Sequence, residues 1–549
     1  MLTGEHGHLV SVPRARPHDE TVVLPKTHAG TVVFPRVPGR APATAGGSDA
    51  ERLTPPGDRP VRRIARWQQL ALFTAPAVVA FVLGRAGIGA RQMWNDEHAT
   101  WHAATLTWGE LFHLLDNIDR VLTLYYVMMH GWVRLAGETP AMLRLPSLVA
   151  MACAAGFTAL VGQRLFNSHA GLIAGIAFAV MPVVCRYAQE ARPYAFAVAA
   201  ATLATLLLLV ALDHPRWPYW LMYAGAVVLT AFLHLVAVVV LTAHVLLLWF
   251  RYQKSDRDVR LWKSIGAFAL ILAFVMPLGQ AGSGQSSAIE WIKADRAAVV
   301  TLPVRLFGSY AVAAAFAGMA LLAIVTLPSA RRRRVAVTLL VWALAPPIIT
   351  YLTFPLLHLF LYRYLLFTLP AWALLAAGGI YGIAHAVSRR SWPQLLIAAA
   401  ALPALVLLTL PAHQAARERI VPGEPDYQAA AQTILADLRP DDGIVFAGNI
   451  RPPRMGMAYA MREGPRPADV LAVTTSTELG SYATQECPVT LPCLASRERI
   501  WLVSTSYSND PWSEMPKEKA STLNRVLTVT ETKRFPRIHV YLLVRKPPA

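Results

Sequence analysis

Charged side chains are scarce in this chain of 549 residues: they make up 15% of it, against about a quarter in an ordinary soluble protein. Acidic residues are scarcer than basic ones: 33 Asp and Glu stand against 51 Lys and Arg, which gives a net charge of +18. The bases fall mostly in short clusters between apolar runs. That distribution argues against a nucleic-acid partner and is typical of a polytopic membrane protein, as is the mean hydropathy of +0.40.

Several chemical signatures are absent from the sequence. It has no His/Cys cluster at metal-ligand spacing, no glycine-rich nucleotide-binding pattern, and no Ser-His-Asp or Cys-His arrangement for covalent catalysis. Cysteine is rare, with four in all. Cys153 and Cys185 fall inside apolar runs and are expected to be packing residues.

Long apolar runs dominate the middle of the chain. About eleven of them are close to the 17 to 25 residues that a helix needs to cross a bilayer. The fifth and sixth are short, because His234 interrupts one continuous apolar stretch. The runs lie near residues 69–89, 143–163, 169–187, 194–212, 219–233, 235–250, 263–279, 308–327, 335–355, 364–386 and 394–411.

The connections between the runs predict an orientation. Residues 1–66 are rich in Pro, Gly and Arg, have no hydrophobic periodicity, and predict a disordered cytoplasmic tail. If that tail is inside, every inner connection contains Arg or Lys, as the positive-inside rule requires. The outer face then receives residues 90–142, the turn 186–194 and the whole segment 412–549.

The segment 412–549 predicts a separate extracytoplasmic α/β domain. Residues 427–438 have helical apolar spacing, whereas 443–447, 500–503 and 539–544 are typical of buried strands. Cys487 and Cys493 lie in this segment and predict a small-loop disulfide in an oxidising exterior. The alternative is two free surface thiols.

Two adjacent carboxylates, Asp96 and Glu97, follow the first apolar run in the stretch MWNDEHATWH. An ionised group near the hydrocarbon boundary must find water, a cation or a donor. The turn QEARPY after the third run brings Glu190 and Arg192 to the same face. These groups predict a polar site. The alternatives are a solvated loop anchored by its tryptophans, and a local Glu190–Arg192 pair of little energetic value.

The order of these motifs resembles that of the family 39 glycosyltransferases of the GT-C fold, which include the protein O-mannosyltransferases and the lipid A aminoarabinose transferase. The resemblance covers residues 67 to about 411 and is strongest over 90–200. It implies a GT-C membrane domain over 67–411 whose catalytic loop is 90–142. The matching motifs are Asp96-Glu97, Asp119 through Leu124-Tyr125-Tyr126, Leu143-Arg144-Leu145-Pro146-Ser147 and Gln189-Glu190-Ala191-Arg192-Pro193-Tyr194.

The resemblance implies catalytic roles for three acids. Asp96 would be the base that deprotonates or orients the acceptor hydroxyl, and Glu97 would support it by hydrogen bonding or by holding the loop. Glu190 would bind acceptor or sugar hydroxyls. Some GT-C enzymes use a divalent cation such as Mg²⁺ or Mn²⁺ and others do not; where one is used, Asp96 and Glu190 would share it.

The resemblance also implies groups that bind the donor. Arg192 would bind the donor phosphate, and Arg363 is a second candidate, with a snorkelling interface arginine as the alternative. His358 and His234 are expected to be structural, and the alternative for His234 is that it lines the donor groove. The loop 279–308 is either a lid or an ordinary flexible loop. Expected substrate contacts are Asp119, Tyr125, Tyr194 and Tyr364.

These implications predict an inverting transferase in the plasma membrane. It would move a sugar, mannose or arabinose, from a polyprenyl-phosphate donor to a lipid-linked or cell-wall glycan on the outer face. The loop 279–308 is too short for the extra lumenal module of many protein O-mannosyltransferases, which weakens the case for a protein acceptor. The composition is typical of a high-GC bacterium such as an actinomycete.

Two other functions remain open. A lipid-linked sugar flippase or transporter would use the acids to bind substrate without transfer, but it would more often carry mid-span charges and repeat symmetry. The acids here cluster at one face and no repeat is evident, which favours transfer. A transferase-like scaffold without activity is the third reading, and the presence of both Asp96 and Glu190 argues against it.

Overall fold

The computed structural model describes residues 66–547 except 254–257, 328, 388–390, 416, 421–422, 449–450, 495–496 and 507. The disordered tail predicted for residues 1–66 therefore lies outside the described residues, apart from Arg66, where the first helix begins.

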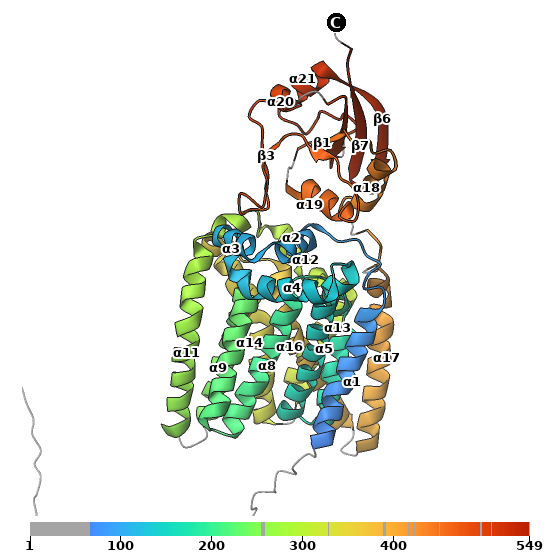
Figure 1. Cartoon of the computed structure of the whole chain (residues 1–549). Helices are drawn as coiled ribbons and strands as arrows, with labels where there is room; N and C mark the ends of the chain where they lie inside the picture. The colour runs from blue at the N-terminus through green and yellow to red at the C-terminus, as the bar shows by residue number, and fades with distance from the viewer. Residues whose placement is uncertain are drawn as a thin grey trace, which may run out of the picture. The chain divides into compact units, whose positions relative to one another are not determined.

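A helical bundle accounts for the apolar runs (Figure 1). In the described part of the chain, seven segments are long and apolar enough to cross a membrane, or nine if each of two bent pairs is one span. The runs near 219–233 and 394–411 fall on the shorter apolar helix α9 (Trp217–Leu233) and on α17 (Ser391–Ala415). The exact number of spans stays a prediction. The seven segments are α1 (Arg66–Arg85), α5 (Pro140–Leu165), α8 (Tyr194–Asp213), η2 with α10 (Leu235–Val240, Leu241–Tyr252), α11 (Asp258–Ser283), α14 (Ala330–Leu352) and η4 with α16 (Tyr362–Thr368, Leu369–Val387).

The two bent pairs break at residues that favour a helix end. The first bends by 64° just before Pro182, which suits the first position of a helix. The second bends by 81° at Gly308, whose φ of 88° ends one helix before the Ser309 side chain caps the next. The two bends touch, since a Cβ on Gly308 would lie 3.0 Å from the Cβ of Pro182. The pairs are α6 (Ser168–Ala179) with α7 (Pro182–Ala188), and α12 (Arg296–Phe307) with α13 (Tyr310–Thr326).

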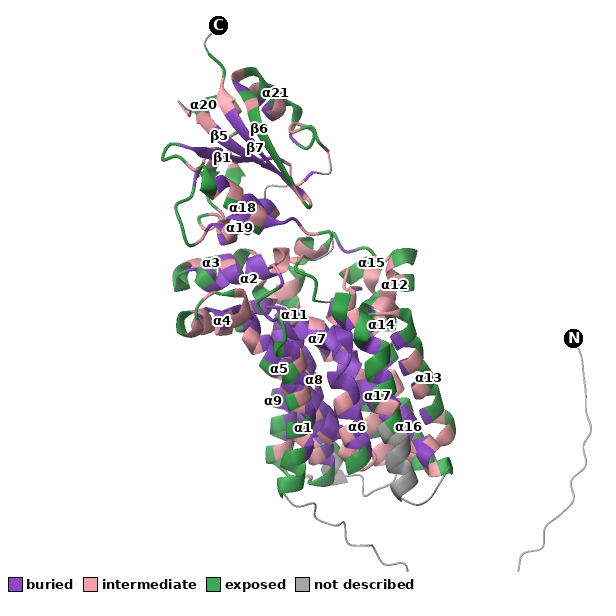
Figure 2. Ribbon diagram, turned by 90° about the vertical axis from the view of Figure 1, so that its right-hand side faces the viewer, coloured by how far each residue is buried: buried purple, intermediate pink, exposed green. Residues whose placement is uncertain are grey.

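The core of the bundle lies along α5, α8 and α16, which Figure 2 shows as largely buried. Small residues let these helices pack closely: a Cβ on Gly379 of α16 would lie 2.2 Å from the carbonyl oxygen of Met319 in α13. Large apolar side chains such as Leu70 and Val82 of α1 are instead exposed, as expected for surfaces that face lipid.

The predicted first loop, residues 90–142, is mostly helical. Its helices lie across one end of the bundle (Figure 1). The second of them begins with a capping box between Thr107 and Glu110 and buries Leu111, Leu114 and Leu115. The elements are α2 (Asn95–Thr105), α3 (Trp108–Asn117), η1 (Arg120–Leu122) and α4 (Thr123–Ala136).

The chain after α17 folds into an α/β domain around a five-stranded sheet of order β2-β1-β5-β7-β6. Strands β1 and β5 are parallel, and β7 pairs antiparallel with β5 and β6. Apolar clusters cover both faces of the sheet, one with α18 and α19 and the other with α21. The elements are α18 (Tyr427–Ala436), β1 (Gly443–Phe446), α19 (Arg451–Ala460), β2 (Ala468–Asp469), β3 (Ala472–Thr474), β4 (Gln485–Glu486), α20 (Thr490–Cys493), β5 (Arg499–Ser504), α21 (Lys517–Val526), β6 (Leu527–Phe535) and β7 (Ile538–Arg545).

Cys487 and Cys493 form a disulfide, and Cys493 is the last residue of α20. Cys153 and Cys185 are unpaired and lie within α5 and α7.

Candidate active site

A cavity of about 450 Å³ opens where α2, α8, η4 and α19 meet. It collects residues from the first loop, from the turn after α7, from the segment before α16 and from the C-terminal domain. The predicted site residues that line it are Asp96, Asp119, Arg192, Tyr194, Arg363 and Tyr364. The predicted site residues that do not line it are Glu97, Glu190 and Tyr125.

Asp96 lies in the first turn of α2, where the helix dipole favours an anion. Its Oδ2 is 3.3 Å from Nη2 of Arg363, and its side chain keeps 26% of its surface exposed. The guanidinium of Arg363 stands 5.3 Å from the ring centre of Trp94 and 5.4 Å from that of Trp291. Arg363 is therefore an enclosed cation within the cavity rather than a snorkelling surface arginine, and Asp96 is the carboxylate that faces it.

Glu97, the next residue, points into the protein. Nε and Nη2 of Arg144 donate to its two carboxylate oxygens, each at 2.7 Å, and the backbone N–H of Ala191 donates to Oε1 at 2.9 Å. Burial opposes ionisation, but the charge and hydrogen bonds of Arg144 outweigh it, so the pKa of Glu97 is lowered. This buried pair ties α2 to α5 and to the turn that carries Arg192. Glu97 thus has the geometry of a residue that holds the loop.

Glu190 pairs with Arg186 rather than with Arg192. The two are one helical turn apart, with Oε2 of Glu190 3.2 Å from Nη2 of Arg186. Glu190 is 1% exposed. Its burial raises the pKa to about 7 against the lowering effect of Arg186, with smaller raising contributions from the charges of Glu97 and Asp96. Glu190 is therefore a buried group outside the cavity lining whose charge changes near neutral pH.

Arg192 points from the same turn toward the cavity. Its Nη1 donates to the hydroxyl of Tyr126 at 3.2 Å and to the backbone carbonyl of Asp96 at 3.4 Å. Its guanidinium lies 5.8 Å from the ring centre of Tyr194. Arg192 and Arg363 thus place two cations around one cavity. Asp96 contacts both, since its backbone carbonyl accepts from Arg192 and its carboxylate faces Arg363.

Asp119 forms a three-membered cluster with two tyrosines. It adopts a left-handed backbone conformation, with φ of 59°. Its Oδ2 accepts from the hydroxyls of Tyr126 at 3.0 Å and Tyr482 at 2.9 Å, and the two hydroxyls are 3.0 Å apart. Tyr482 comes from the C-terminal domain, so this cluster joins that domain to the first loop at the edge of the cavity.

Aromatic rings form another wall. Tyr194 and Tyr364 line the cavity, and the buried ring of His234 lies 4.8 Å from that of Tyr364 and 5.6 Å from that of Tyr194. Tyr125 packs instead against Phe196, away from the cavity. His358 ends the short helix α15 (Phe354–Leu357), and its ring meets that of Phe354 edge-on, with the ring centres 4.9 Å apart.

Two further segments line the cavity. Residues 279–308, expected to be either a lid or an ordinary flexible loop, hold the end of α11 and all of α12, and the stretch between these helices contributes Trp291 and the short helix η3 (Ser286–Ile289). Gln285 fixes this stretch by accepting from the backbone N–H of Arg120 at 2.8 Å. The C-terminal domain contributes the start of α19. Only long-range packing brings these residues to the cavity, and no local motif marks them. The residues from α19 are Arg451, Pro452 and Met455.

Two carboxylates at this site, those of Asp96 and Glu190, each face an arginine side chain. Asp96 faces Arg363, and Glu190 faces Arg186. Among the described residues no group of three or more His, Cys, Asp or Glu side chains is placed to hold a metal ion. The donor set around Asp96 and Glu190 therefore does not match the oxygen-rich coordination of Mg²⁺ or Mn²⁺, and no step below depends on a metal.

Comparison with known proteins supports the fold. Residues 123–279 match the family described as dolichyl-phosphate-mannose-protein mannosyltransferase. No curated protein matches the sequence. The structure of ArnT from Cupriavidus metallidurans in the apo state has a TM-score of 0.57 at 13% identity, over 86% of this chain and 97% of that one. The same protein bound to undecaprenyl phosphate has a TM-score of 0.53 at 13% identity, over 87% and 98%.

These likenesses confirm two predictions. The structural likeness supports the fold of a GT-C membrane protein with a C-terminal α/β domain. The match over residues 123–279 supports the recognised resemblance to the protein mannosyltransferase family.

Proposed function

We propose that this chain, a GT-C membrane protein similar to ArnT and to the protein mannosyltransferase family, is an inverting glycosyltransferase that takes its sugar from a polyprenyl-phosphate carrier. The observation that carries the proposal is the placement of Asp96 in an open cavity beside two arginines, Arg192 and Arg363. A carboxylate can accept the proton of a hydroxyl nucleophile, and two guanidiniums can hold a phosphate that leaves with negative charge. The undecaprenyl phosphate bound to ArnT supports the same class of carrier.

The contacts suggest how the step proceeds. The donor phosphate binds Arg192 and Arg363, which draws Arg363 away from Asp96 and leaves that carboxylate free to accept a proton. The acceptor oxygen then attacks the anomeric carbon while its proton passes to Asp96. The bond between the anomeric carbon and the phosphate oxygen breaks, and its electron pair leaves with the polyprenyl phosphate. One displacement inverts the anomeric configuration and requires no enzyme nucleophile.

An apolar groove between α4, α5, α8 and α9 suits the hydrocarbon chain of the carrier. Its volume is about 700 Å³, and its wall includes Val127 and Met128, which directly follow Tyr126 on α4. Tyr126 belongs to the cluster around Asp119, so α4 carries residues of both the groove and that cluster. We propose that the polyprenyl chain lies along it while the phosphate reaches the two arginines.

We propose mannose or arabinose as the sugar and a lipid-linked or cell-wall glycan of the cell envelope as the acceptor, in a high-GC bacterium such as an actinomycete. The chain would lie in the plasma membrane with its N-terminus inside and its α/β domain outside. Support comes from the arginines of the inner connections: Arg164, Arg251 and Arg331 lie at the ends of α5, α10 and α14 that are distant from Asp96.

A transfer assay separates this function from its rival, a flippase or transporter. Purified full-length protein in liposomes is given polyprenyl-phosphate sugars labelled in the sugar, together with membrane extract as acceptor. A transferase releases one free polyprenyl phosphate for each labelled sugar that appears in the acceptor. Movement of the intact labelled lipid across the bilayer, with no release of polyprenyl phosphate from any donor, would contradict transfer.

The raised pKa of Glu190 predicts a pH dependence. As the pH falls through about 7, Glu190 takes up a proton and its ion pair with Arg186 is lost, so we expect the transfer rate to fall on the acid side. Glu190→Gln removes the titrating group, so the transfer rate of this variant should no longer fall on the acid side. The measurement is kcat between about pH 5 and 9; an acid limb of the same midpoint in the Gln variant would contradict the assignment.

Tyr482→Phe tests whether the C-terminal domain positions the site. The change removes one hydroxyl that donates to Asp119. From the usual strength of a hydrogen bond to a charged group, we expect kcat/KM to fall about tenfold. Because Tyr482 acts through Asp119, the loss should come mainly from a higher KM. Tyr541→Phe, in the core of the same domain, is the matched control. Equal kinetics for both variants would show that Tyr482 only packs.

A further inference from the structure

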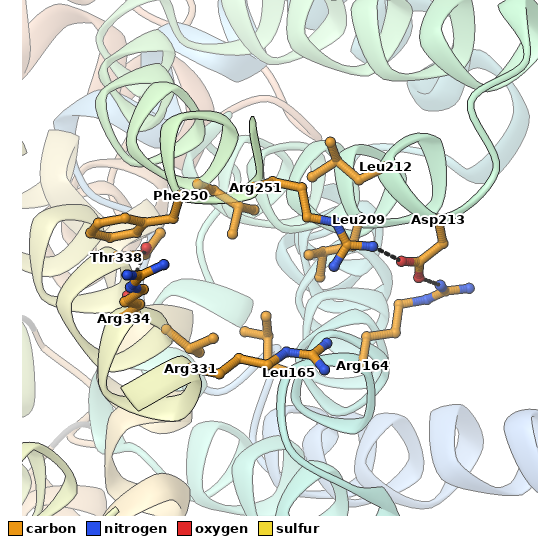
Figure 3. A pocket seen from close by; sticks show the side chains of 12 residues that line it. Arg164, Leu165, Leu209, Leu212, Asp213, Phe250, Arg251, Arg331, Arg334 and Thr338 are labelled. Atoms are coloured by element: carbon orange, nitrogen blue, oxygen red, sulfur yellow. Dashed lines mark hydrogen bonds and ion pairs between the residues drawn. The ribbon is translucent and has the colours of Figure 1, made fainter. Parts of the chain in front are cut away.

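A second cavity, of about 120 Å³, lies far from Asp96. Helices α5 and α8 connect the two places: Arg144 and Tyr194 stand near their N-terminal ends, whereas Arg164 and Asp213 at their C-terminal ends line this cavity. Twenty helical residues span roughly 30 Å, so the cavity lies at the other face of the membrane. Its lining comes from α5, α8, α10 and α14 and includes Arg164, Leu165, Leu209, Leu212, Asp213, Phe250, Arg251, Arg331, Arg334 and Thr338 (Figure 3).

Positive charge dominates this second cavity, since four arginines face one carboxylate. Asp213 accepts from Arg164 and Arg251, each at 3.0 Å (Figure 3). Within the described ranges, Arg331 and Arg334 have no carboxylate partner. Arg334 instead lies 5.5 Å from the ring centre of Phe250. The cavity therefore carries an excess of guanidinium that an anion would neutralise.

The position of two of these arginines, at the positive end of a helix dipole, adds to the excess of positive charge in the cavity. Arg331 lies in the first turn of α14, which Ser329 caps, and Arg334 follows at the start of the second turn. The positive end of a helix dipole disfavours cations at this place and favours an anion. Since residues three apart share a helix face, Arg331 and Arg334 reach the cavity together. Arg332 and Arg333 do not line it, and Arg332 stacks on Tyr381.

Beneath the arginines the cavity is apolar. A smaller cavity of about 20 Å³ continues it inward toward His244. An arginine-lined mouth above an apolar floor, at the end of a membrane bundle, matches a molecule with an anionic head and a hydrocarbon chain. The residues that line both cavities are Leu165, Leu209, Leu247, Val335 and Thr338.

We infer that this cavity is a binding site for the phosphate head group of an anionic glycerophospholipid. The phosphate lies among Arg164, Arg251, Arg331 and Arg334, and one acyl chain begins along the leucines below. The orientation predicted from the basic clusters places the site in the cytoplasmic leaflet, whose anionic lipids attract such clusters. The site is separate from the proposed reaction and does not depend on it.

Lipid retention by the full-length protein tests this site. The protein is placed in nanodiscs of phosphatidylcholine with a graded fraction of phosphatidylglycerol, and native mass spectrometry counts the lipids that remain bound. We expect selective retention of phosphatidylglycerol, and a loss of affinity of about 30-fold in the double variant Arg331→Gln/Arg334→Gln, since two arginines that neutralise an anionic head are removed. The control Arg332→Gln/Arg333→Gln removes the same charge from the same turn and should behave as the wild type.

Three results would overturn the inference. One is equal loss in the control pair, which would indicate general surface charge. Another is equal retention of phosphatidylcholine and phosphatidylglycerol by the wild type. The third is displacement of the lipid by inorganic phosphate at equal concentration, which would indicate a soluble anion. The last two use the wild type alone, so they decide the question even if the double variant does not fold.

Discussion

Asp96→Asn is expected to lower the rate of sugar transfer by about 10²–10⁴-fold, the usual contribution of a positioned general base. Asparagine has nearly the same shape but cannot accept the acceptor's proton. Asp96 is partly exposed and its partner Arg363 is also held by two tryptophans, so the fold should survive. Donor binding should survive as well, because the phosphate is assigned to Arg192 and Arg363.

Two measurements check this prediction. Steady-state transfer gives kcat, and binding of the labelled donor to the same preparation gives its Kd. Asp116→Asn is the matched control, since Asp116 is an exposed carboxylate of α3 that pairs with its neighbour Arg120. An Asp96→Asn variant that transfers as fast as wild type would refute the assignment of the base.

Glu97→Ala is expected to destabilise the protein by about 3–5 kcal/mol, as the loss of one partner of a buried ion pair usually does. The change leaves Arg144 charged and buried, and it removes the acceptor for the N–H of Ala191. The lowered pKa of Glu97 means that the pair's contribution is present above the ordinary pKa of a glutamate and is lost as the pH falls through the lower value in the folded protein.

Thermal unfolding in detergent at neutral pH and again under acid conditions measures this effect. The wild type should lose stability on acidification more steeply than the variant, which no longer has the carboxylate. Asp116→Ala removes an exposed pair that is worth only about 0–1 kcal/mol and serves as control. If both variants unfold alike, the buried pair is not what holds the first loop.

Bilayer thickness made the membrane bundle predictable. Because a span needs a fixed length of apolar sequence, hydropathy located the long apolar helices, and His234 marked the break between α9 and η2. Hydropathy missed α12, which lies within the expected loop 279–308. The helices of the first loop were not foreseen, because they lie across the end of the bundle and carry no long apolar run. Strand β6 was missed for a related reason: it is an edge strand, and residues such as Glu531, Lys533 and Arg534 face solvent.

The adjacent acids show the limit of a motif. Asp96 and Glu97 follow each other on a helix, so their side chains point about 100° apart. One reaches the cavity and the other reaches Arg144. The sequence marked the pair but could not assign the directions, since these depend on where α2 packs.

Long-range contacts were beyond sequence reasoning. Tyr482 bonds to Asp119, which is 363 residues earlier, and Trp291 covers Arg363 from residues 279–308, where the sequence left a lid and an ordinary flexible loop open. The choice of Arg186 over Arg192 as the partner of Glu190 is similar, because both spacings are feasible locally. What decides it is the direction in which the turn places Arg192.

The anomeric configuration of the product is the most direct test of the central claim that Asp96 and the two arginines support a single displacement. Nuclear magnetic resonance of the transferred sugar, compared with that of the polyprenyl-phosphate donor, reports it in one experiment. We predict inversion. Retention would exclude a single displacement from the face opposite the leaving phosphate and would contradict the account.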